Sequence, residues 1–362
     1  MADATPIEWT DATWNPIGGC TRVSEGCRNC YAEVMAARFS GPGQWGEGLA
    51  RIVRDADGKA IDHRWTGQMR FNDRALDLPL RWRKPRRIFV NSTSDLFHEN
   101  VPDEWIDKVF AVMALASQHT FQVLTKRPER AREYMDGRRA NFGRASDFLA
   151  DMEHSLSEDD HQDAVDRLDL FDSMGKPLSN LWLGTSIEDQ ATANARIPHL
   201  LNTPAAVRFV SAEPLLGPVS LDDMCDGTKF IDALRGKWWH DTEPPYIEGG
   251  KPRLDWVIVG GESGPGARPV HPDWARSLRD QCQAAGVAFH FKQWGAWGPS
   301  TETEAAGNPH SGWQCLAGHP HVARVHELHP EAGAAFMERK GKARAGRLLD
   351  GREWNDMPGV RG

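Results

Sequence analysis

The sequence predicts an α/β protein whose parallel strands form a barrel or an open barrel. Three observations lead to this fold class. Short apolar runs, rich in β-branched and aromatic residues, alternate with helical stretches along most of the 362-residue chain. The spacing between the runs leaves room for the crossover helix of a parallel βαβ unit. Each run also ends in polar residues, and the strand ends of a parallel barrel meet at one mouth, where active sites lie.

Seven strands and one early helix are expected, in chain order. The first strand covers residues 12–15 and is kept short by Asn15-Pro16. A helix from Tyr31 to Phe39 follows, and a Ser-Gly-Pro-Gly sequence ends it. The residues from there to the next strand are expected to form a connection that contains a helix. Six further strands are expected at residues 87–91, 120–124, 180–184, 207–210, 255–259 and 287–291.

Two segments interrupt the alternation, and a third follows it. Residues 143–178 are acidic and predict a helical insertion, whereas residues 222–253 predict a loop excursion. Each insertion is compatible with a lid or recognition surface and equally with surface decoration. We expect residues 1–300 to form the barrel with both insertions. Residues 301–362 are expected to form a C-terminal extension that packs back on the barrel, with Trp354 as an anchor.

Composition limits the classes of function. A hydrophobic content of 40% with 26% charged residues is typical of a soluble protein with a sizeable core. No membrane span is visible and the start lacks the features of a secretory signal, so we expect a cytoplasmic protein. The net charge of −8 argues against a protein that coats nucleic acid nonspecifically. The basic segments at residues 81–87 and 126–132 can nevertheless bind phosphate locally.

Three of the six cysteines, Cys20, Cys27 and Cys30, lie within eleven residues in a glycine-rich loop, with the spacing Cys-x6-Cys-x2-Cys. In a reducing compartment such a cluster indicates ligands or catalytic groups rather than disulfides. Three thiolates leave one position of a four-coordinate centre unassigned. This suits an iron–sulfur cluster with one open iron, or a zinc ion completed by a histidine such as His98. Three packed free thiols are the remaining alternative. The other cysteines are isolated: Cys225, Cys282 and Cys315.

Seven segments together resemble a known family: IEWTDATWNPIGGCTRVSEGCRNCYAE, FVNSTSDLFHE, VLTKRPER, LWLGTSIEDQ, FVSAEPLLGP, WVIVGGESGPGARP and FKQWG. They look like a phage- and prophage-associated three-cysteine family that is usually placed among radical S-adenosylmethionine (SAM) enzymes. The resemblance spans nearly the whole chain. It implies a partial (β/α)6 TIM-like barrel of the radical SAM type.

The resemblance also implies the cofactors. A [4Fe–4S] cluster would be held by Cys20, Cys27 and Cys30, with SAM on the fourth iron. Reduction of the cluster, by an electron donor such as flavodoxin or ferredoxin, would cleave SAM to methionine and a 5′-deoxyadenosyl radical that abstracts hydrogen from the substrate. The usual radical SAM spacing is Cys-x3-Cys-x2-Cys, so the six-residue first gap is a departure from the pattern.

A second departure concerns the SAM amino group. The Gly-Gly-Glu that commonly follows the second strand of radical SAM enzymes is absent, and Ser92, Ser94 and Asp95 occupy that location as possible substitutes. The triplet Gly260, Gly261 and Glu262 follows the sixth strand instead, where its glycines would let the backbone approach SAM. A helix cap at Asp95 and a tight turn at the glycines are the alternative roles.

Further ligands are expected at the other strand ends. Acceptors for the SAM ribose are expected from Thr185, Ser186 and Glu188, with Glu213 as the next candidate. Lys126, next to Arg127, is expected to pair with the SAM carboxylate or a substrate phosphate, the alternative being a solvated helix start. Lys292 leaves the last strand at the mouth, where a lysine needs a partner, and we expect it to be catalytic.

Two functions remain open from the sequence. The first is a radical SAM enzyme whose substrate is a nucleobase, nucleotide or nucleic acid, suggested by the phage association and the basic segments. Trp238, Trp239 and Trp294 would then be available to stack on bases, with core packing as their alternative role. The second is a zinc-stabilised, non-catalytic barrel that binds a protein or nucleic-acid partner.

Overall fold

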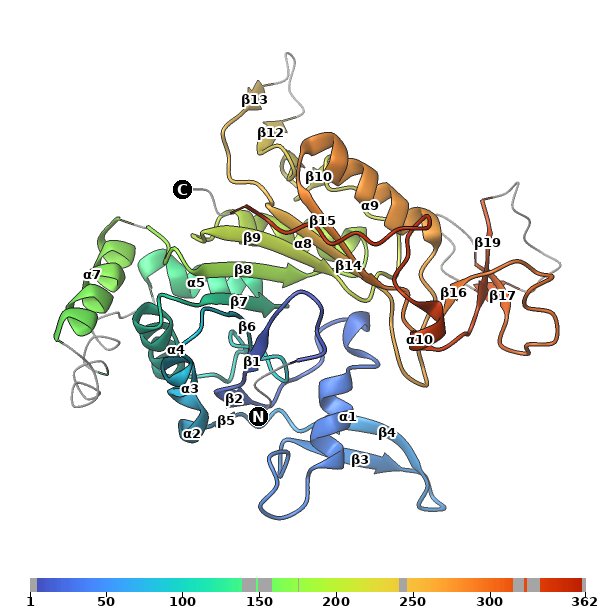
Figure 1. Ribbon diagram of the computed structural model, residues 1–362, viewed down its shortest axis with the longest axis horizontal. Helices are drawn as coiled ribbons and strands as arrows, with labels where there is room; N and C mark the ends of the chain where they lie inside the picture. Colours follow the sequence, from blue (N-terminus) through green and yellow to red (C-terminus); the bar gives the residue numbers. More distant parts are fainter. Residues whose placement is uncertain are drawn as a thin grey trace.

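A seven-stranded parallel sheet organises the computed structural model (Figure 1), which describes residues 5–138, 148, 158–174, 176–240, 246–314, 322–323 and 333–359. All seven expected strands are confirmed, and every adjacent pair is parallel. In spatial order they are β1 (Ala12–Trp14), β6 (Arg87–Val90), β7 (Thr120–Thr125), β8 (Leu181–Ser186), β9 (Val207–Ala212), β14 (Trp256–Gly260) and β15 (Ala288–Gln293).

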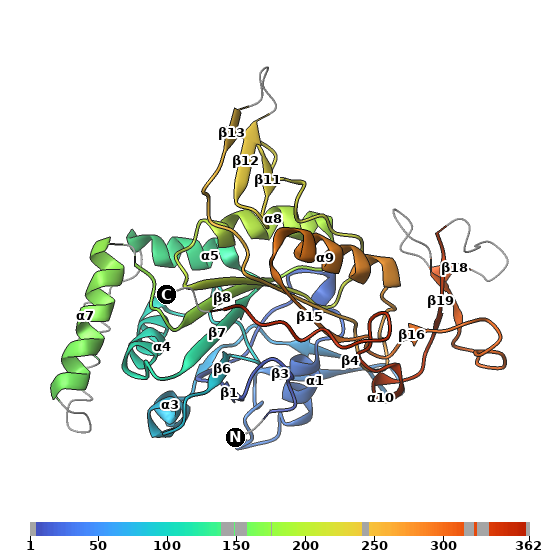
Figure 2. The same ribbon diagram turned by 45° about the horizontal axis from the view of Figure 1, so that its top comes forward.

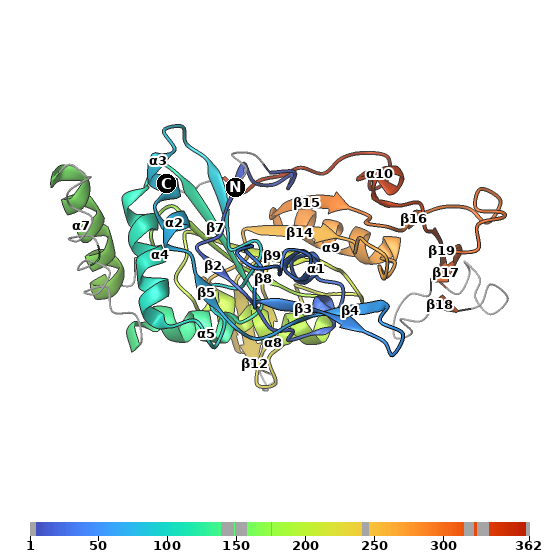
Figure 3. The same cartoon turned by 90° about the horizontal axis from the view of Figure 1, so that it is seen from below.

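The sheet is open, with β1 and β15 at its two edges, and it curls into a half-barrel (Figure 3). The fold is therefore a mixed α/β architecture that is compatible with a TIM-like barrel. Helices follow the strands and cover the outer face: α4 (Asp103–Leu115), α5 (Pro128–Glu133), the π-helical turn η2 (Tyr134–Arg138), α8 (Gln190–Leu201) and α9 (Pro272–Ala285).

Local sequence sets the ends of these helices. At the start of α8, the Asp189 carboxylate accepts the backbone N–H of Thr192 at 2.8 Å, while the Thr192 hydroxyl accepts the N–H of Asp189 at 3.0 Å. This reciprocal pair is a capping box. Helix α9 begins with Pro272 and ends at Gly286, whose φ of 65° is the left-handed conformation that glycine adopts without strain.

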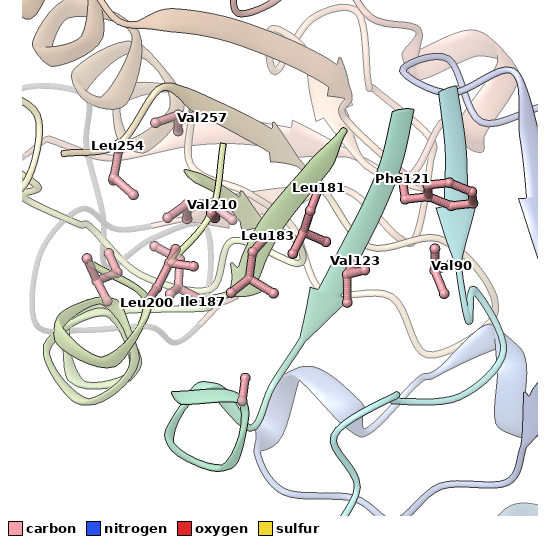
Figure 4. Packing of buried hydrophobic residues seen from close by; sticks show 14 of the residues in the cluster. Val90, Phe121, Val123, Leu181, Leu183, Ile187, Leu200, Val210, Leu254 and Val257 are labelled. Carbon is pink, nitrogen blue, oxygen red and sulfur yellow. The ribbon is translucent and has the colours of Figure 1, made fainter. Parts of the chain in front are cut away.

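Alternation along the strands gives the sheet two different faces. On the outer face, Val123, Leu183 and Val210 pack against the helices (Figure 4). The inner face carries a separate aromatic layer, made by Trp9, Phe89, Trp182, Phe209 and Trp256.

One inner position needs a glycine. Gly184 lies beside Phe209, and a Cβ there would come within 2.5 Å of the Phe209 ring. The aromatic layer therefore fills the interior below the carboxyl ends of the strands.

The cysteine loop leads into a small subdomain at the carboxyl edge of β1. Its elements are β2 (Ile17–Gly18), η1 (Glu25–Cys27), α1 (Tyr31–Arg38), the hairpin β3 (Ala50–Arg54) and β4 (Ala60–Trp65), β5 (Arg70–Phe71), α2 (Asp73–Leu76) and α3 (Leu78–Arg81). The helix at α1 was expected, but the hairpin was not. Its turn is fixed by the Asp55 carboxylate, which accepts the N–H groups of Asp57 and Lys59.

The described parts of both insertions lie away from this edge. Within residues 143–178, the structure describes α7 (Glu158–Met174), which packs on α4, and most of residues 143–157 lie outside the described part. Residues 222–253 form an antiparallel arm rather than a loop (Figure 2): β10 (Met224–Cys225), β11 (Phe230–Asp232), β12 (Lys237–His240) and β13 (Tyr246–Glu248). Each insertion precedes the amino end of a strand, β8 or β14, so the part of it that the structure describes is not placed as a lid over the carboxyl ends.

The C-terminal segment flanks the carboxyl edge and then returns along β15. Its elements are β16 (Gly298–Pro299), β17 (Gly312–Gln314), β18 (Val322–Ala323), β19 (Ala335–Glu338) and α10 (Lys342–Ala345). The backbone of Trp354 accepts the N–H of Phe291 at 3.0 Å, which covers part of the outer edge of β15. The Trp354 ring packs edge-on against Phe289 at 5.9 Å. Among the described residues, no helix has the length and apolar character needed to cross a membrane.

Candidate functional site

The three clustered thiols lie at the carboxyl edge of β1, on the loop that joins this strand to α1. Gly19 pairs with Ser94 in a parallel bridge, and the Ser94 hydroxyl donates to the carbonyl of Ile17 at 2.8 Å. The loop is therefore fastened to the end of β6. The turn η1 ends at Cys27, α1 begins directly after Cys30, and the thiols are close enough to influence one another electrostatically.

Burial favours the protonated form of two of the thiols, Cys20 and Cys30. It raises the pKa of Cys20 to about 12, with Asp95 adding to the increase and Arg127 opposing it. Burial also raises the pKa of Cys30, and the backbone amides at the start of α1 oppose this without offsetting it. A metal centre binds thiolates, so its positive charge would have to reverse the effect of burial at both sulfurs.

The donor set fits a metal centre in its chemistry but not in its present arrangement. Three sulfurs on one loop suit an iron–sulfur cluster in kind and number. Within the described part of the chain, however, no three His, Cys, Asp or Glu side chains are arranged to hold a metal ion. The thiols are thus neighbours that would still have to converge on a cluster.

His98 is poorly placed as a fourth ligand for zinc. It is fully buried, its Nδ1 accepts the N–H of Asn100 at 3.0 Å, and its Nε2 lies 2.9 Å from the Thr21 hydroxyl. Both ring nitrogens are therefore engaged. The geometry gives no support to the sequence-based hypothesis that His98 completes a zinc site with the three cysteines.

Arg127 connects the cysteine loop to the ends of β6 and β7. Its guanidinium lies 4.0 Å from the Cys20 sulfur, 3.1 Å from the Asp95 carboxylate and 2.7 Å from the Thr21 hydroxyl. Burial alone would lower the pKa of Arg127, but Asp95, Cys20 and Glu99 outweigh it and raise this pKa. The arginine is therefore a permanent cation beside Cys20.

Asp95 holds this arrangement rather than facing the mouth with free acceptors. Its carboxylate accepts the Thr125 hydroxyl at 2.7 Å, the N–H of Phe97 at 3.1 Å and the N–H of Lys126 at 3.0 Å, in addition to the Arg127 guanidinium. Four donors occupy the positions at which a carboxylate commonly accepts hydrogen bonds. An interaction with the SAM amino group would need one of them to be displaced.

Glu188 anchors the cysteine loop from β8. Only 1% of its side chain is exposed, and it pairs with Lys126 and with Arg196, the latter at 3.0 Å. It also accepts the Ser24 hydroxyl at 2.9 Å. Gly26 lies against the same carboxylate, because a Cβ on this glycine would come within 2.3 Å of Oε1. Glu188 was expected to bind SAM, and Lys126 to bind SAM or a substrate phosphate; in the structure these two side chains pair with each other.

The remaining hydroxyl candidates differ in availability. Ser92 donates to Asn15 at 3.1 Å, and Thr185 donates to the carbonyl of Thr125 at 2.9 Å. Together with Ser94, they tie neighbouring strand ends to each other. Ser186 is buried at the end of β8, and among the described residues its hydroxyl has no hydrogen-bond partner. Ser186 is therefore the best placed of these hydroxyls to accept a ligand.

Glu213 and Lys292 come together on the inner side of the mouth. The Lys292 ammonium lies 3.2 Å from the Glu213 carboxylate, which also accepts the Ser211 hydroxyl at 3.2 Å. Gly260 lies directly beneath, because a Cβ at this position would come within 2.2 Å of the carboxylate. These residues come from the ends of three neighbouring strands, β9, β14 and β15. The pair is partly exposed on the inner side of the mouth.

Gly261 and Glu262 serve the loop after β14. A Cβ on Gly261 would meet the carbonyl of Trp294 at 2.0 Å, so this glycine permits close backbone packing. Glu262 pairs with Arg268 at 2.8 Å, and Arg268 also reaches the carbonyl of Glu25 at 2.9 Å. The loop after β14 thereby contacts the cysteine loop. Sequence reasoning missed Arg268 and Glu25, and no local motif indicates their pairing across the chain.

One of the two basic segments and two of the three candidate stacking tryptophans lie away from the cysteine loop. Residues 81–87 lead into the amino end of β6, at the opposite edge of the sheet from the cysteines. The Trp238 ring packs under Lys229 at 3.7 Å, and Trp239 stacks on Phe230 at 5.7 Å, both in the arm. Trp294 is buried and donates to the carbonyl of Leu348. These contacts indicate packing roles for the three tryptophans.

Comparison with known proteins places the chain in a family. Neither a curated protein nor a solved structure matches it significantly. The family described as "Protein of unknown function (DUF5131)" matches residues 4–358, which is nearly the whole chain. The protein is therefore a member of the DUF5131 family.

Proposed function

We propose that the protein is a radical SAM enzyme in which Cys20, Cys27 and Cys30 bind a [4Fe–4S] cluster. The main support is the position of the three thiols: they share one loop at the carboxyl edge of a parallel half-barrel, where catalytic groups of such folds collect. We propose equally that the protein is related to the phage-associated radical SAM enzymes.

The bound cofactors supply electron transfer and a hydrogen-abstracting radical; the chain supplies placement. Arg127 stabilises the thiolate of Cys20, because a guanidinium beside a sulfur favours its charged form. Glu188 holds the loop on the strands through Ser24 and through the close approach of Gly26. Binding would thus require the thiols to converge without detaching the loop.

SAM and the substrate would occupy the inner side of the mouth. Ser186 offers a free hydroxyl to the SAM ribose, and the Glu213–Lys292 pair offers one anionic and one cationic group to either ligand. Lys292 can transfer a proton or orient the substrate once Glu213 has a new partner. The substrate class that we propose is a nucleobase-containing molecule, with a low-potential protein such as flavodoxin or ferredoxin as the electron donor.

The test is anaerobic purification and reconstitution with iron and sulfide, followed by metal analysis and electron paramagnetic resonance after dithionite reduction. SAM is then added, and 5′-deoxyadenosine is measured. The proposal predicts a cluster signal and SAM cleavage. A colourless protein that binds one zinc ion tightly and cleaves no SAM under strict exclusion of air would refute it and favour the zinc-stabilised barrel.

Matched variants separate ligands from other cysteines. Replacing Cys20, Cys27 or Cys30 with Ala is expected to abolish the cluster. Cys225→Ala and Cys282→Ala are the controls, because both residues are free cysteines outside the loop. Loss of the cluster in a control variant that still folds would show that the ligands are assigned wrongly.

A further inference from the structure

A surface pocket adjoins the cysteine loop. Its volume is about 320 Å³, and it lies between the loop, α1 and the β3–β4 hairpin. Five residues line it: Thr21, Arg22, Glu33, Arg64 and Trp65. Thr21 directly follows Cys20, so the pocket and the candidate metal centre share a segment of chain. The volume is near the lower end of those that bind small molecules, about 300–1,000 Å³.

A buried carboxylate fixes the wall of the pocket. Glu33 is 1% exposed and accepts Nε of Arg22 at 2.8 Å and the backbone N–H of Trp65 at 2.7 Å. Arg22 also donates to the carbonyl of His63 at 2.9 Å. The Trp65 ring packs against the small alanine cluster beneath α1. The guanidinium of Arg22 and the indole of Trp65 are therefore held in place before any ligand arrives.

The donors of the pocket are only partly used. Arg22 makes its hydrogen bonds through Nε and Nη2, which leaves Nη1 without a partner among the described residues. Arg64 uses only Nη1, in a 2.6 Å ion pair with Asp62 and a bond to a backbone carbonyl. The Nε1 of Trp65 likewise has no acceptor in the part of the chain that the structure describes. The unused groups are all N–H donors.

The hairpin also brings two arginines together at a cost. Arg51 on β3 lies directly opposite Arg64 on β4. Like charges in directly opposed positions destabilise a pair of strands. Asp62 and Glu33 each engage one edge of a guanidinium and leave the other edge free, in a chain whose net charge is −8. The opposed arginines therefore do not stabilise the hairpin, and the unused N–H groups of Arg64 are available to an anion.

We propose that this pocket binds a nucleotide unit of the substrate, with phosphate oxygens on Arg22 and Arg64 and the base against Trp65. A phosphate is well matched by guanidinium donors, and an indole ring is a good surface for stacking a base. The inference rests on the proposed function, since it assigns the substrate class of the same site. The nucleotide unit can belong to a free mononucleotide or to a single strand, which share this chemistry.

Binding to the full-length protein tests the pocket without the need for catalysis. Isothermal titration calorimetry would use four probes: nucleoside 5′-monophosphates, the corresponding nucleosides, inorganic phosphate and a short oligothymidylate. We expect Arg64→Gln to weaken monophosphate or oligonucleotide binding by about tenfold or more, and Trp65→Phe to weaken it less. Arg54→Gln is the matched control, because Arg54 lies at the tip of the same hairpin and bonds only to Gly58. It should leave binding unchanged.

Each outcome distinguishes the sources or refutes the pocket. Saturable binding of monophosphates supports a free nucleotide, and binding of the oligonucleotide alone supports a strand, provided that Arg64→Gln weakens it selectively. Three outcomes would overturn the proposal. They are no saturable binding, equal losses of affinity in Arg64→Gln and Arg54→Gln, and binding of inorganic phosphate as tight as that of monophosphates. Formation of 5′-deoxyadenosine by the same preparation without nucleotide binding would refute the pocket alone, whereas nucleotide binding without SAM cleavage would refute only the radical SAM function.

Discussion

Glu188→Gln tests whether a buried carboxylate holds the cysteine loop on the sheet. The substitution keeps the shape of the side chain and removes its charge. Lys126 and Arg196 then lose their anionic partner while their side chains remain only 19% and 11% exposed. Removing one partner of a buried ion pair costs about 3–5 kcal/mol, because the remaining charge is left uncompensated. We expect a loss near the lower end of this range, since the amide can still accept a hydrogen bond.

The pH dependence gives a second measure of the same anchor. Burial by itself would raise the pKa of Glu188, but Lys126 and Arg196 outweigh it and the pKa is lowered. A carboxylate whose folded pKa is lowered stabilises the protein fully above its unfolded pKa, about 4.3. This contribution is lost as the pH falls through the folded pKa. The Gln variant should therefore lose less stability upon acidification than the wild type.

Urea unfolding followed by circular dichroism measures the free energy of unfolding. The iron content after reconstitution measures whether the loop still places the thiols for metal binding. The control is Asp77→Asn, because the exposed Asp77–Arg81 pair should contribute no more than about 1 kcal/mol. Equal stability and equal iron content in Glu188→Gln and Asp77→Asn would refute the anchoring role. A stability loss with normal iron content would show that Glu188 supports β8 but not the cysteine loop.

Three further predictions concern the same region and the interior. Gly26→Ala should reduce iron loading, because its Cβ would lie 2.3 Å from the Glu188 carboxylate. Gly249→Ala is the control, since no atom lies within 4 Å of a Cβ at that position, and equal iron loading in the two variants would contradict the prediction. Arg127→Lys should shift the reduction potential of the reconstituted cluster, measured by a redox titration, because a lysine cannot reproduce the contacts with Cys20, Asp95 and Thr21 together; an unchanged potential would refute this. Burial lowers the pKa of His290 to about 4 in the folded protein, whereas in the unfolded chain this pKa is about 6.5. Between these pH values the unfolded chain binds one more proton than the folded protein, so the stability should fall by up to about 3 kcal/mol. His290→Leu should remove that part of the pH dependence in urea unfolding, and an unchanged profile would contradict the assignment.

The strands were predictable because their signal is local. Each buried strand is a short apolar run with polar residues at its end, as at Trp256–Gly260, and tertiary contacts only had to agree with that pattern. The β3–β4 hairpin was missed because most of its side chains are exposed or half-buried, so no apolar alternation marks it. Its one signal was the turn at Asp55 to Lys59, which brings polar strands together.

The site was predictable in location but not in pairing. Polar residues at strand ends meet at one edge in any parallel sheet, and the structure brings Glu213 and Lys292 together there. The partners of Glu188 could not be read from the sequence, because Ser24 is 164 positions away and the contact depends on a glycine that admits the carboxylate. Glu188 was therefore predicted as a ligand, but in the structure it holds the loop that carries the thiols.

These contacts give a physical reason for the long first gap between cysteines. Of the six residues between Cys20 and Cys27, five contact residues outside this segment. The sixth, Val23, is an exposed apolar side chain. Thr21 contacts Arg127, and Arg22 contacts Glu33. Ser24 and Gly26 both contact Glu188, and Glu25 contacts Arg268.

A gap of three residues would have to give up several of these attachments. The loop would then lose its link to β8 through Glu188 or its link to α1 through Glu33, and it would also lose a wall of the pocket beside Trp65. Shortening the gap should therefore impair nucleotide binding as well as placement of the thiols. The extra residues do not loosen the cysteine loop; they attach it to the strands on one side and to the pocket on the other.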